Sequence, residues 1–188
     1  DVHHGNGTEA IFIDRPDVLT ISMHQENNFP QNSGGADVRG EGAGEGFNMN
    51  IPLAPGCGHE AYLHAFDRLV LPALHTFKPD VIVVACGFDA SGVDPLSRML
   101  ATSRTFDGMT RRLMAAADDL CDGRLVMAHE GGYSEVHVPF CGHAVIAALA
   151  GSGIQITDPL DARITGHQPT DRVSAQHCQW IDELVDLI

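Results

Sequence analysis

Residues 80–96, DVIVVACGFDASGVDPL, decide the fold. The first part, 81–86, is an unbroken apolar run, which is typical of a strand buried on both faces of a parallel sheet. The second part, GFDASGVDP, is polar and follows the strand directly. In open α/β sheets the functional residues gather at the carboxyl ends of the strands. The stretch therefore predicts an α/β fold and the edge of the sheet at which to look for a site.

Strands and helices alternate on both sides of this stretch. A β-branched segment predicts a strand over 18–23, an alternating pattern predicts one over 48–53, and a short apolar run predicts one over 124–128. Helical spacing predicts helices over 58–77, 104–120 and about 139–150, with Pro72 kinking or splitting the first, and Thr8 is the expected N-cap of a short helix near the start. This alternation predicts a single α/β domain with a mainly parallel sheet.

The composition limits the classes of partner. The chain has 188 residues, with 11 Lys and Arg against 25 Asp and Glu, and a net charge of -14. Such a charge repels nucleic acid and anionic membranes and favours a cationic substrate. No apolar stretch is long enough to cross a membrane. The five cysteines are scattered without a C-x-x-C pair, which predicts free thiols in a reducing compartment such as the cytoplasm.

Three polar clusters follow expected strands: DVHH at 1–4, GFDASGVDP at 87–95 and HEGGYS at 129–134. Asp1 and His3 are two residues apart, so an extended segment aims both at one point, and Asp89 adds a carboxylate from another strand end. One imidazole and two carboxylates suit a catalytic zinc ion with an open position. Each fragment alone has a simpler interpretation, a surface D-x-H pair or a helix cap at Asp89. Their joint arrangement favours the metal.

The third cluster offers a hydroxyl. Gly131 and Gly132 allow a sharp turn and a close approach of the backbone, and they would place Tyr133 over the same rim. A tyrosine hydroxyl can donate a hydrogen bond to an oxyanion in the transition state. Taken in isolation, G-G-Y is more simply an ordinary turn followed by a packed aromatic ring.

Together the motifs resemble the histone deacetylases and their bacterial amidohydrolase relatives. The resemblance rests on DVHHGNGT at 1–8, S-x-H at 22–24, GEGFNMNIPL at 44–53, GFDASGVDPL at 87–96 and EGGY at 130–133, in the family's order. It implies the arginase/deacetylase fold, a three-layer α/β/α sandwich. It also implies that 1–150 is the C-terminal portion of the catalytic domain, without the N-terminal strands, and that 151–188 is an extension of the same domain.

The resemblance assigns roles to particular residues. Asp1, His3 and Asp89 would bind one zinc ion, and Tyr133 would polarise the substrate carbonyl. Ser22, with the backbone around Asp1, His3 and Met23, matches a monovalent-cation site, usually for potassium. Asn6 would orient a catalytic histidine. The substrate would be bound by Phe29 as a tunnel wall, by Gly131 and Gly132, and by Leu96 at the rim.

Two details refine the assignment within the family. Related ureohydrolases that bind two manganese ions have D-x-H-x-D, whereas Gly5 stands at the last of these positions here, so one metal is expected. The motif DVHHGNGT, with Asn6, resembles that of class II enzymes. Tyr133 matches the residue of members that are active on acetyl-lysine.

The resemblance predicts a zinc-dependent hydrolase that removes acetyl groups from lysine side chains of proteins or peptides. Acetylpolyamine amidohydrolysis is the second choice, and a non-catalytic module that binds metal or acyl-lysine is the third. The family's histidine dyad lies upstream of Asp1, and none of the histidines present matches it, so the chain alone is expected to be impaired. The sequence leaves open whether identical copies associate.

Overall fold

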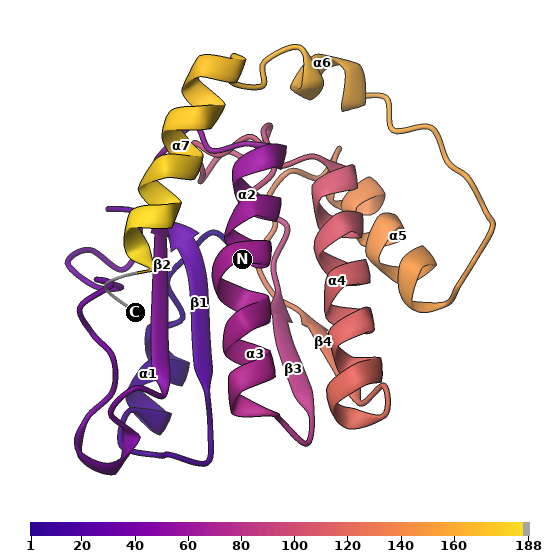
Figure 1. The fold of residues 1–188 in the computed structure, drawn as a ribbon. Coiled ribbons are helices and arrows are strands. Elements are labelled where there is room, and N and C mark those ends of the chain that lie inside the picture. Colours follow the sequence, from indigo (N-terminus) through magenta and orange to yellow (C-terminus); the bar gives the residue numbers. More distant parts are fainter. Residues whose placement is uncertain (186–188) are drawn as a thin grey trace.

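The structure is a computed structural model that describes residues 1–185. Four strands form two parallel pairs (Figure 1). β1 (Thr20–Gln25) pairs with β2 (Asn48–Leu53), and β3 (Ile82–Cys86) pairs with β4 (Leu125–His129). The parallel α/β class is therefore confirmed, although the described residues form two two-stranded sheets and not one continuous sheet.

The helices connect and cover these strands. They are α1 (Asn6–Phe12), α2 (His59–Ala65), α3 (Leu71–Phe77), α4 (Ser103–Cys121), α5 (Val138–Leu149), α6 (Asp161–Thr165) and α7 (Asp171–Leu184), with a short 3-10 turn at Gly42–Gly44. The helix predicted over 58–77 is divided by a π-helical segment, Phe66–Val70, just before Pro72. The ring of a proline clashes with the carbonyl four residues earlier, and a widened turn relieves this clash.

Two local expectations were wrong. Thr8 does not cap the first helix, because α1 already begins at Asn6 with Gly5 as its N-cap. The run 81–86 is not buried on both faces: Val83 is 68% exposed and its register partner Val126 is 56% exposed. The side chains of Val84 and Met127 do pack against the core. In residues 1–185 the strand pair β3–β4 is therefore covered on one face only.

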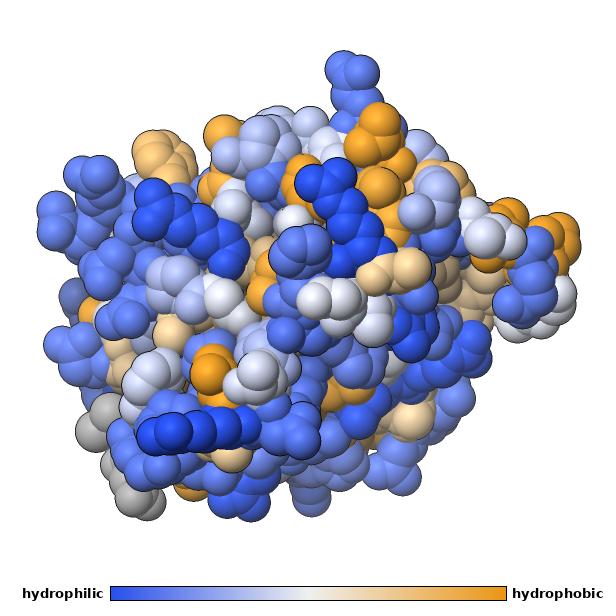
Figure 2. Space-filling view, turned by 90° about the horizontal axis from the view of Figure 1, so that it is seen from above, coloured by the Kyte–Doolittle hydropathy of each residue, from blue (hydrophilic) through white to orange (hydrophobic). Residues whose placement is uncertain are grey.

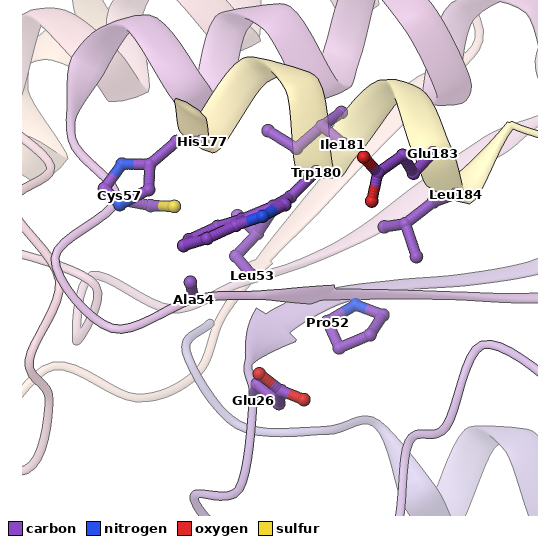
Figure 3. A pocket seen from close by; sticks show the side chains of 10 residues that line it. All are labelled: Glu26, Pro52, Leu53, Ala54, Cys57, His177, Trp180, Ile181, Glu183 and Leu184. Atoms are coloured by element: carbon purple, nitrogen blue, oxygen red, sulfur yellow. The ribbon is translucent and has the colours of Figure 1, made fainter. Parts of the chain in front are cut away.

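The C-terminal segment leaves the body after α5 and returns to it as a helix. A long arm at 150–160 leaves α5 and returns to α6 and α7 (Figure 1). Helix α7 packs on α2, and its Ile181 joins the hydrophobic core. Figure 3 shows Trp180 and Leu184 reaching from α7 toward Pro52 and Leu53 at the end of β2, beside a pocket of about 240 Å³. Helix α7 thus caps the β2 end of the body.

The surface seen from above in Figure 2 is mainly hydrophilic, with apolar side chains in small separate groups. No helix among residues 1–185 is long and apolar enough to span a bilayer. The five cysteines are all free thiols, as the sequence predicted.

Candidate metal centre

Asp1, His3 and Asp89 come together although 86 residues separate His3 from Asp89. One ligand atom from each lies within 4.8 Å of the others. His3 Nδ1 is 3.0 Å from Asp1 Oδ1 and 3.0 Å from Asp89 Oδ2. Ligands about 2 Å from a tetrahedral zinc ion lie roughly 3.3 Å apart, which is close to these spacings. The three residues predicted as metal ligands therefore converge on one point.

Backbone hydrogen bonds hold the two carboxylates in place. The Val2 N–H donates to Asp89 Oδ1 at 2.6 Å, and the Gly131 N–H donates to Asp1 Oδ2 at 3.0 Å. The backbone nitrogen of Asp1 donates to the Gly87 carbonyl at 3.2 Å. Each contact joins parts of the chain that are far apart in sequence. The strand ends of β3 and β4 and the segment 1–3 consequently form one rigid rim.

The free oxygen of Asp89 indicates that a cation fits here. Asp89 is fully buried, and its Oδ2 has no hydrogen-bond partner. The nearby His3 Nδ1 is at 3.0 Å but does not meet hydrogen-bond geometry. An ionised oxygen buried without a partner is costly, and a bound cation removes that cost. The donor set of one imidazole and two carboxylates suits zinc, so the residues present fit the metal that the resemblance implies.

Two different structural constraints explain why glycine stands at both Gly131 and Gly132. A side-chain carbon at Gly131 would overlap Asp89 Oδ2 and lie 2.7 Å from Asp1 Oδ2, so only glycine fits at this close approach. Gly132 has φ of +137°, a conformation that side chains rarely adopt. The predicted close approach of the backbone is therefore present next to the candidate metal ligands, whereas residues 130–134 form no regular turn.

Two aromatic rings stand edge-on to the His3 imidazole. The ring centroid of Phe29 is 6.2 Å away and that of Tyr133 is 6.4 Å away. Both rings are exposed, at 66% and 52%. Asp94 holds the backbone of Tyr133, because its Oδ2 accepts the Tyr133 N–H at 2.7 Å. The rings of Phe29 and Tyr133 therefore both lie beside the candidate ligand His3.

A large hollow opens beside these rings. It has a volume of about 1670 Å³, and its lining includes Asp1, His3, Phe29, Leu96 and Tyr133. Leu96 is half exposed, and its carbonyl accepts a hydrogen bond from the Asn28 side chain at 3.3 Å. The same hollow continues between β1 and β3, where apolar side chains of both strands line it. The candidate metal ligands Asp1 and His3 therefore line an open hollow.

Ser22 and Asn6 also line this hollow. Ser22 Oγ accepts the Gly5 N–H at 3.0 Å and lies 3.0 Å from His24 Nδ1. Asn6 is the exposed first residue of α1. The potassium role of Ser22 and the orienting role of Asn6 stay predictions.

A buried polar group underneath the site was not anticipated from the sequence. Glu9 Oε2 contacts the side-chain nitrogens of His4, Asn48 and Asn50 at 3.2, 3.0 and 2.7 Å. His24 lies against His4, with ring centroids 4.9 Å apart. Burial, together with the neighbouring His4, lowers the pKa of His24 to about 4. The motifs that contain these residues were visible, but nothing in them indicates which side chains meet.

Comparison with known proteins identifies the family. The profile described as "Histone deacetylase domain" matches residues 1–149. The chain belongs to the histone deacetylase family. It is 52% identical over 184 residues to the histone deacetylase-like amidohydrolase of Pseudomonas aeruginosa, covering 98% of this chain and 48% of that protein. It is 43% identical over 152 residues to a probable deacetylase of Archaeoglobus fulgidus, covering 80% of this chain and 42% of that protein.

Solved structures of the family share the fold. The structure of the histone deacetylase Clr3 superposes with a TM-score of 0.80 at 32% identity, covering 98% of this chain and 30% of that one. The HD domain of HDA15 gives a TM-score of 0.77, also at 32% identity, covering 98% of this chain and 48% of that one. The chain spans about half the length of the curated relatives it matches.

Proposed function

We propose that this chain contributes the metal-binding half of a zinc-dependent deacetylase acting on acetyl-lysine in proteins or peptides. The observation that carries the proposal is the convergence of Asp1, His3 and Asp89 within 4.8 Å, with Asp89 Oδ2 buried and unpaired. The names of the relatives, which are deacetylases and amidohydrolases, support hydrolysis of an amide as the reaction class.

Asp1, His3 and Asp89 would hold the zinc ion. When bound, it supplies a Lewis acid for the amide carbonyl and lowers the pKa of a coordinated water. Phe29 and Leu96 offer apolar surface for the methylene chain of a lysine side chain. The Tyr133 hydroxyl donates a hydrogen bond to the oxygen that becomes negative in the transition state. The Asp94 carboxylate, which accepts the Tyr133 N–H, keeps this residue at the rim.

The general base is the incomplete part of the machinery. Among residues 1–185 the Asp1–His3–Asp89 group is joined by no second histidine. The resemblance assigns the base to a histidine dyad upstream of Asp1. Loss of a general base costs about 10²- to 10⁴-fold in rate, so we expect the chain alone to bind metal and hydrolyse slowly.

Metal content of the purified chain tests the proposal. We expect about one zinc ion per chain, measured by mass spectrometry of the metal after dialysis. Asp89→Ala should lose the ion while keeping the circular dichroism spectrum. The matched control Asp119→Ala removes a 70% exposed carboxylate and should keep it. A folded wild-type chain that holds no zinc would sink the ligand assignment.

A parallel assay separates the candidate substrates. The -14 net charge suits both an acetyl-lysine peptide and an acetylated polyamine. The apolar Leu96 at the hollow favours the uncharged stem of a lysine side chain over a chain of ammonium groups. Faster release of acetate from the peptide supports our first choice, and faster release from the polyamine supports the second. Metal and peptide binding without acetate release, in the protein carrying the upstream region, would indicate a non-catalytic module.

A further inference from the structure

Asp158 lies outside residues 1–149, which match the family model, and it begins a chain of buried polar contacts that ends in the turn after Asp89. It belongs to the arm between α5 and α6, and its side chain is 9% exposed. Its Oδ2 accepts a hydrogen bond from Ser103 at 2.7 Å and lies 3.0 Å from His137 Nε2. Its Oδ1 accepts the Leu160 N–H at 2.9 Å. Every oxygen of this carboxylate is thus engaged.

The chain of contacts continues through His137 to Ser91. His137 is fully buried, and its Nδ1 is 2.6 Å from Ser91 Oγ. Because a carboxylate only accepts, Nε2 must carry the proton that it donates to Asp158. In the neutral ring Nδ1 is then an acceptor, and the Ser91 hydroxyl must donate to it. Asp158 therefore selects the tautomer of His137 and, through it, the direction of the Ser91 hydroxyl.

Ser91 lies at the centre of the turn that carries the site. It is two residues after Asp89 and three before Asp94. Its Oγ accepts the Val93 N–H at 3.4 Å, and its carbonyl accepts the Asp94 N–H at 3.0 Å. Asp94 in turn holds the Tyr133 N–H. Ser91 therefore lies along the chain between one candidate metal ligand and the residue that holds the tyrosine backbone, and its hydroxyl bonds this turn at Val93.

The order Ser91–His137–Asp158 is also that of a hydrolase triad, but access decides against nucleophilic catalysis. Ser91 is 1% exposed and His137 is 0% exposed. A nucleophile must reach its substrate. The three residues therefore hold the turn in position and do not act as catalytic groups.

We propose that Asp158 is a positioning residue for the metal centre: through His137 it fixes the Ser91 hydroxyl and with it the turn from Asp89 to Asp94. The proposal rests on the proposed function in so far as it names zinc as the ion at Asp89. It connects residues 150–160, beyond the family match, to the site through two intermediate side chains. The Ser91 side chain bonds the turn and none of the candidate ligand side chains, so we expect a smaller effect on metal affinity than the roughly 10- to 100-fold of groups that bond a ligand directly.

The test compares Asp158→Asn with wild type in the 188-residue chain. The asparagine amide keeps the shape and can donate to His137, which would then accept at Nε2 and carry its proton on Nδ1. We expect ¹⁵N chemical shifts of His137 to report this switch in the metal-free chain. We also expect faster hydrogen exchange of the Val93 and Tyr133 amides, and a several-fold weaker zinc Kd by chelator competition.

Ser91→Ala and Asp161→Asn complete the design. Ser91→Ala removes the hydroxyl at the end of the hydrogen-bonded chain Asp158–His137–Ser91. Its effect on zinc affinity should therefore not add to that of Asp158→Asn in the double variant. Asp161→Asn changes a carboxylate that is 36% exposed and pairs with Arg104, and it should leave the zinc Kd and exchange unchanged. Additive effects on zinc affinity from Ser91→Ala and Asp158→Asn would contradict the relay.

Failure of the two proposals can be told apart. If wild type binds no zinc but Asp158→Asn still switches the tautomer and speeds exchange at Val93 and Tyr133, the positioning role stands and the zinc assignment falls. If Asp158→Asn only lowers the thermal midpoint, with exchange at these amides and zinc Kd as in wild type, the positioning role is overturned.

Discussion

At the scale of single residues, His24 links the pH to the stability of the region under the site. Its imidazole lies in β1 between the His4 ring and the Gly34 carbonyl, which it contacts at 3.0 Å.

The site's chemistry was predictable from single residues to a useful extent. Asp1 and His3 are two residues apart, so their spacing alone indicated that both side chains point toward one place. Only the folded structure shows that Asp89 Oδ2 has no hydrogen-bond partner. The Val2 N–H donates to the other oxygen of this carboxylate, Oδ1.

We expect acid to destabilise the protein through His24. Its pKa in the folded chain is about 4, below its ordinary value of 6.5, because burial disfavours the charged ring. The folded state therefore excludes a proton that the unfolded chain binds. This contribution is fully present above pH 6.5 and is lost as the pH falls toward 4, about 3 kcal/mol in total. Urea unfolding at pH 7, 6, 5 and 4 measures it.

The comparison is with His24→Gln and His75→Gln. His24→Gln should show a shallower loss of unfolding free energy between pH 6.5 and 4 than wild type. His75→Gln changes a histidine that is 51% exposed and should keep the wild-type slope. Identical slopes for wild type and His24→Gln would contradict the assignment.

At the scale of elements, the start of α4 shows what the sequence predicts well. The helix was expected over 104–120 and spans Ser103–Cys121, because its apolar spacing persists for many turns. The strand expected over 18–23 spans Thr20–Gln25, because pairing with β2 and not local propensity sets its ends. The contact of Asp158 with His137 joins an arm without regular structure to a helix start, and no periodicity marks such a contact.

The capping of α4 gives a prediction for this scale. The Thr102 hydroxyl accepts the Thr105 N–H at 3.2 Å, and Thr105 Oγ1 accepts the Thr102 N–H at 3.0 Å. We expect Thr102→Ala to lower the free energy of unfolding by about 1 kcal/mol. Thr170→Ala is the matched control, since Thr170 precedes α7 without a side-chain cap bond, and its effect should stay within a few tenths of a kcal/mol. Equal losses in chemical denaturation would refute the role of the cap.

At the scale of the whole molecule, the exposed face of β3–β4 should drive self-association of this chain. Val83 and Val126 are register partners and are both more than half exposed, so they form adjacent apolar surface. Unpaired strand edges next to such surface recruit further strands. We expect Val83→Lys to raise the monomer fraction in sedimentation velocity at high protein concentration. Val173→Lys, at a 44% exposed position on α7, should not. Unchanged sedimentation of Val83→Lys would rule this surface out.

The long-range geometry of the metal centre has a consequence for folding kinetics. The hydrogen bonds that assemble it span 87 and 130 residues, from Val2 to Asp89 and from Asp1 to Gly131. Closing loops of this length costs chain entropy before any contact repays it, so such contacts form late. A partly folded chain has Asp1 and His3 as a pair without their third ligand. Binding of zinc in a refolding experiment should therefore coincide with the final, cooperative step. The time at which zinc binds would then report when the native topology is complete.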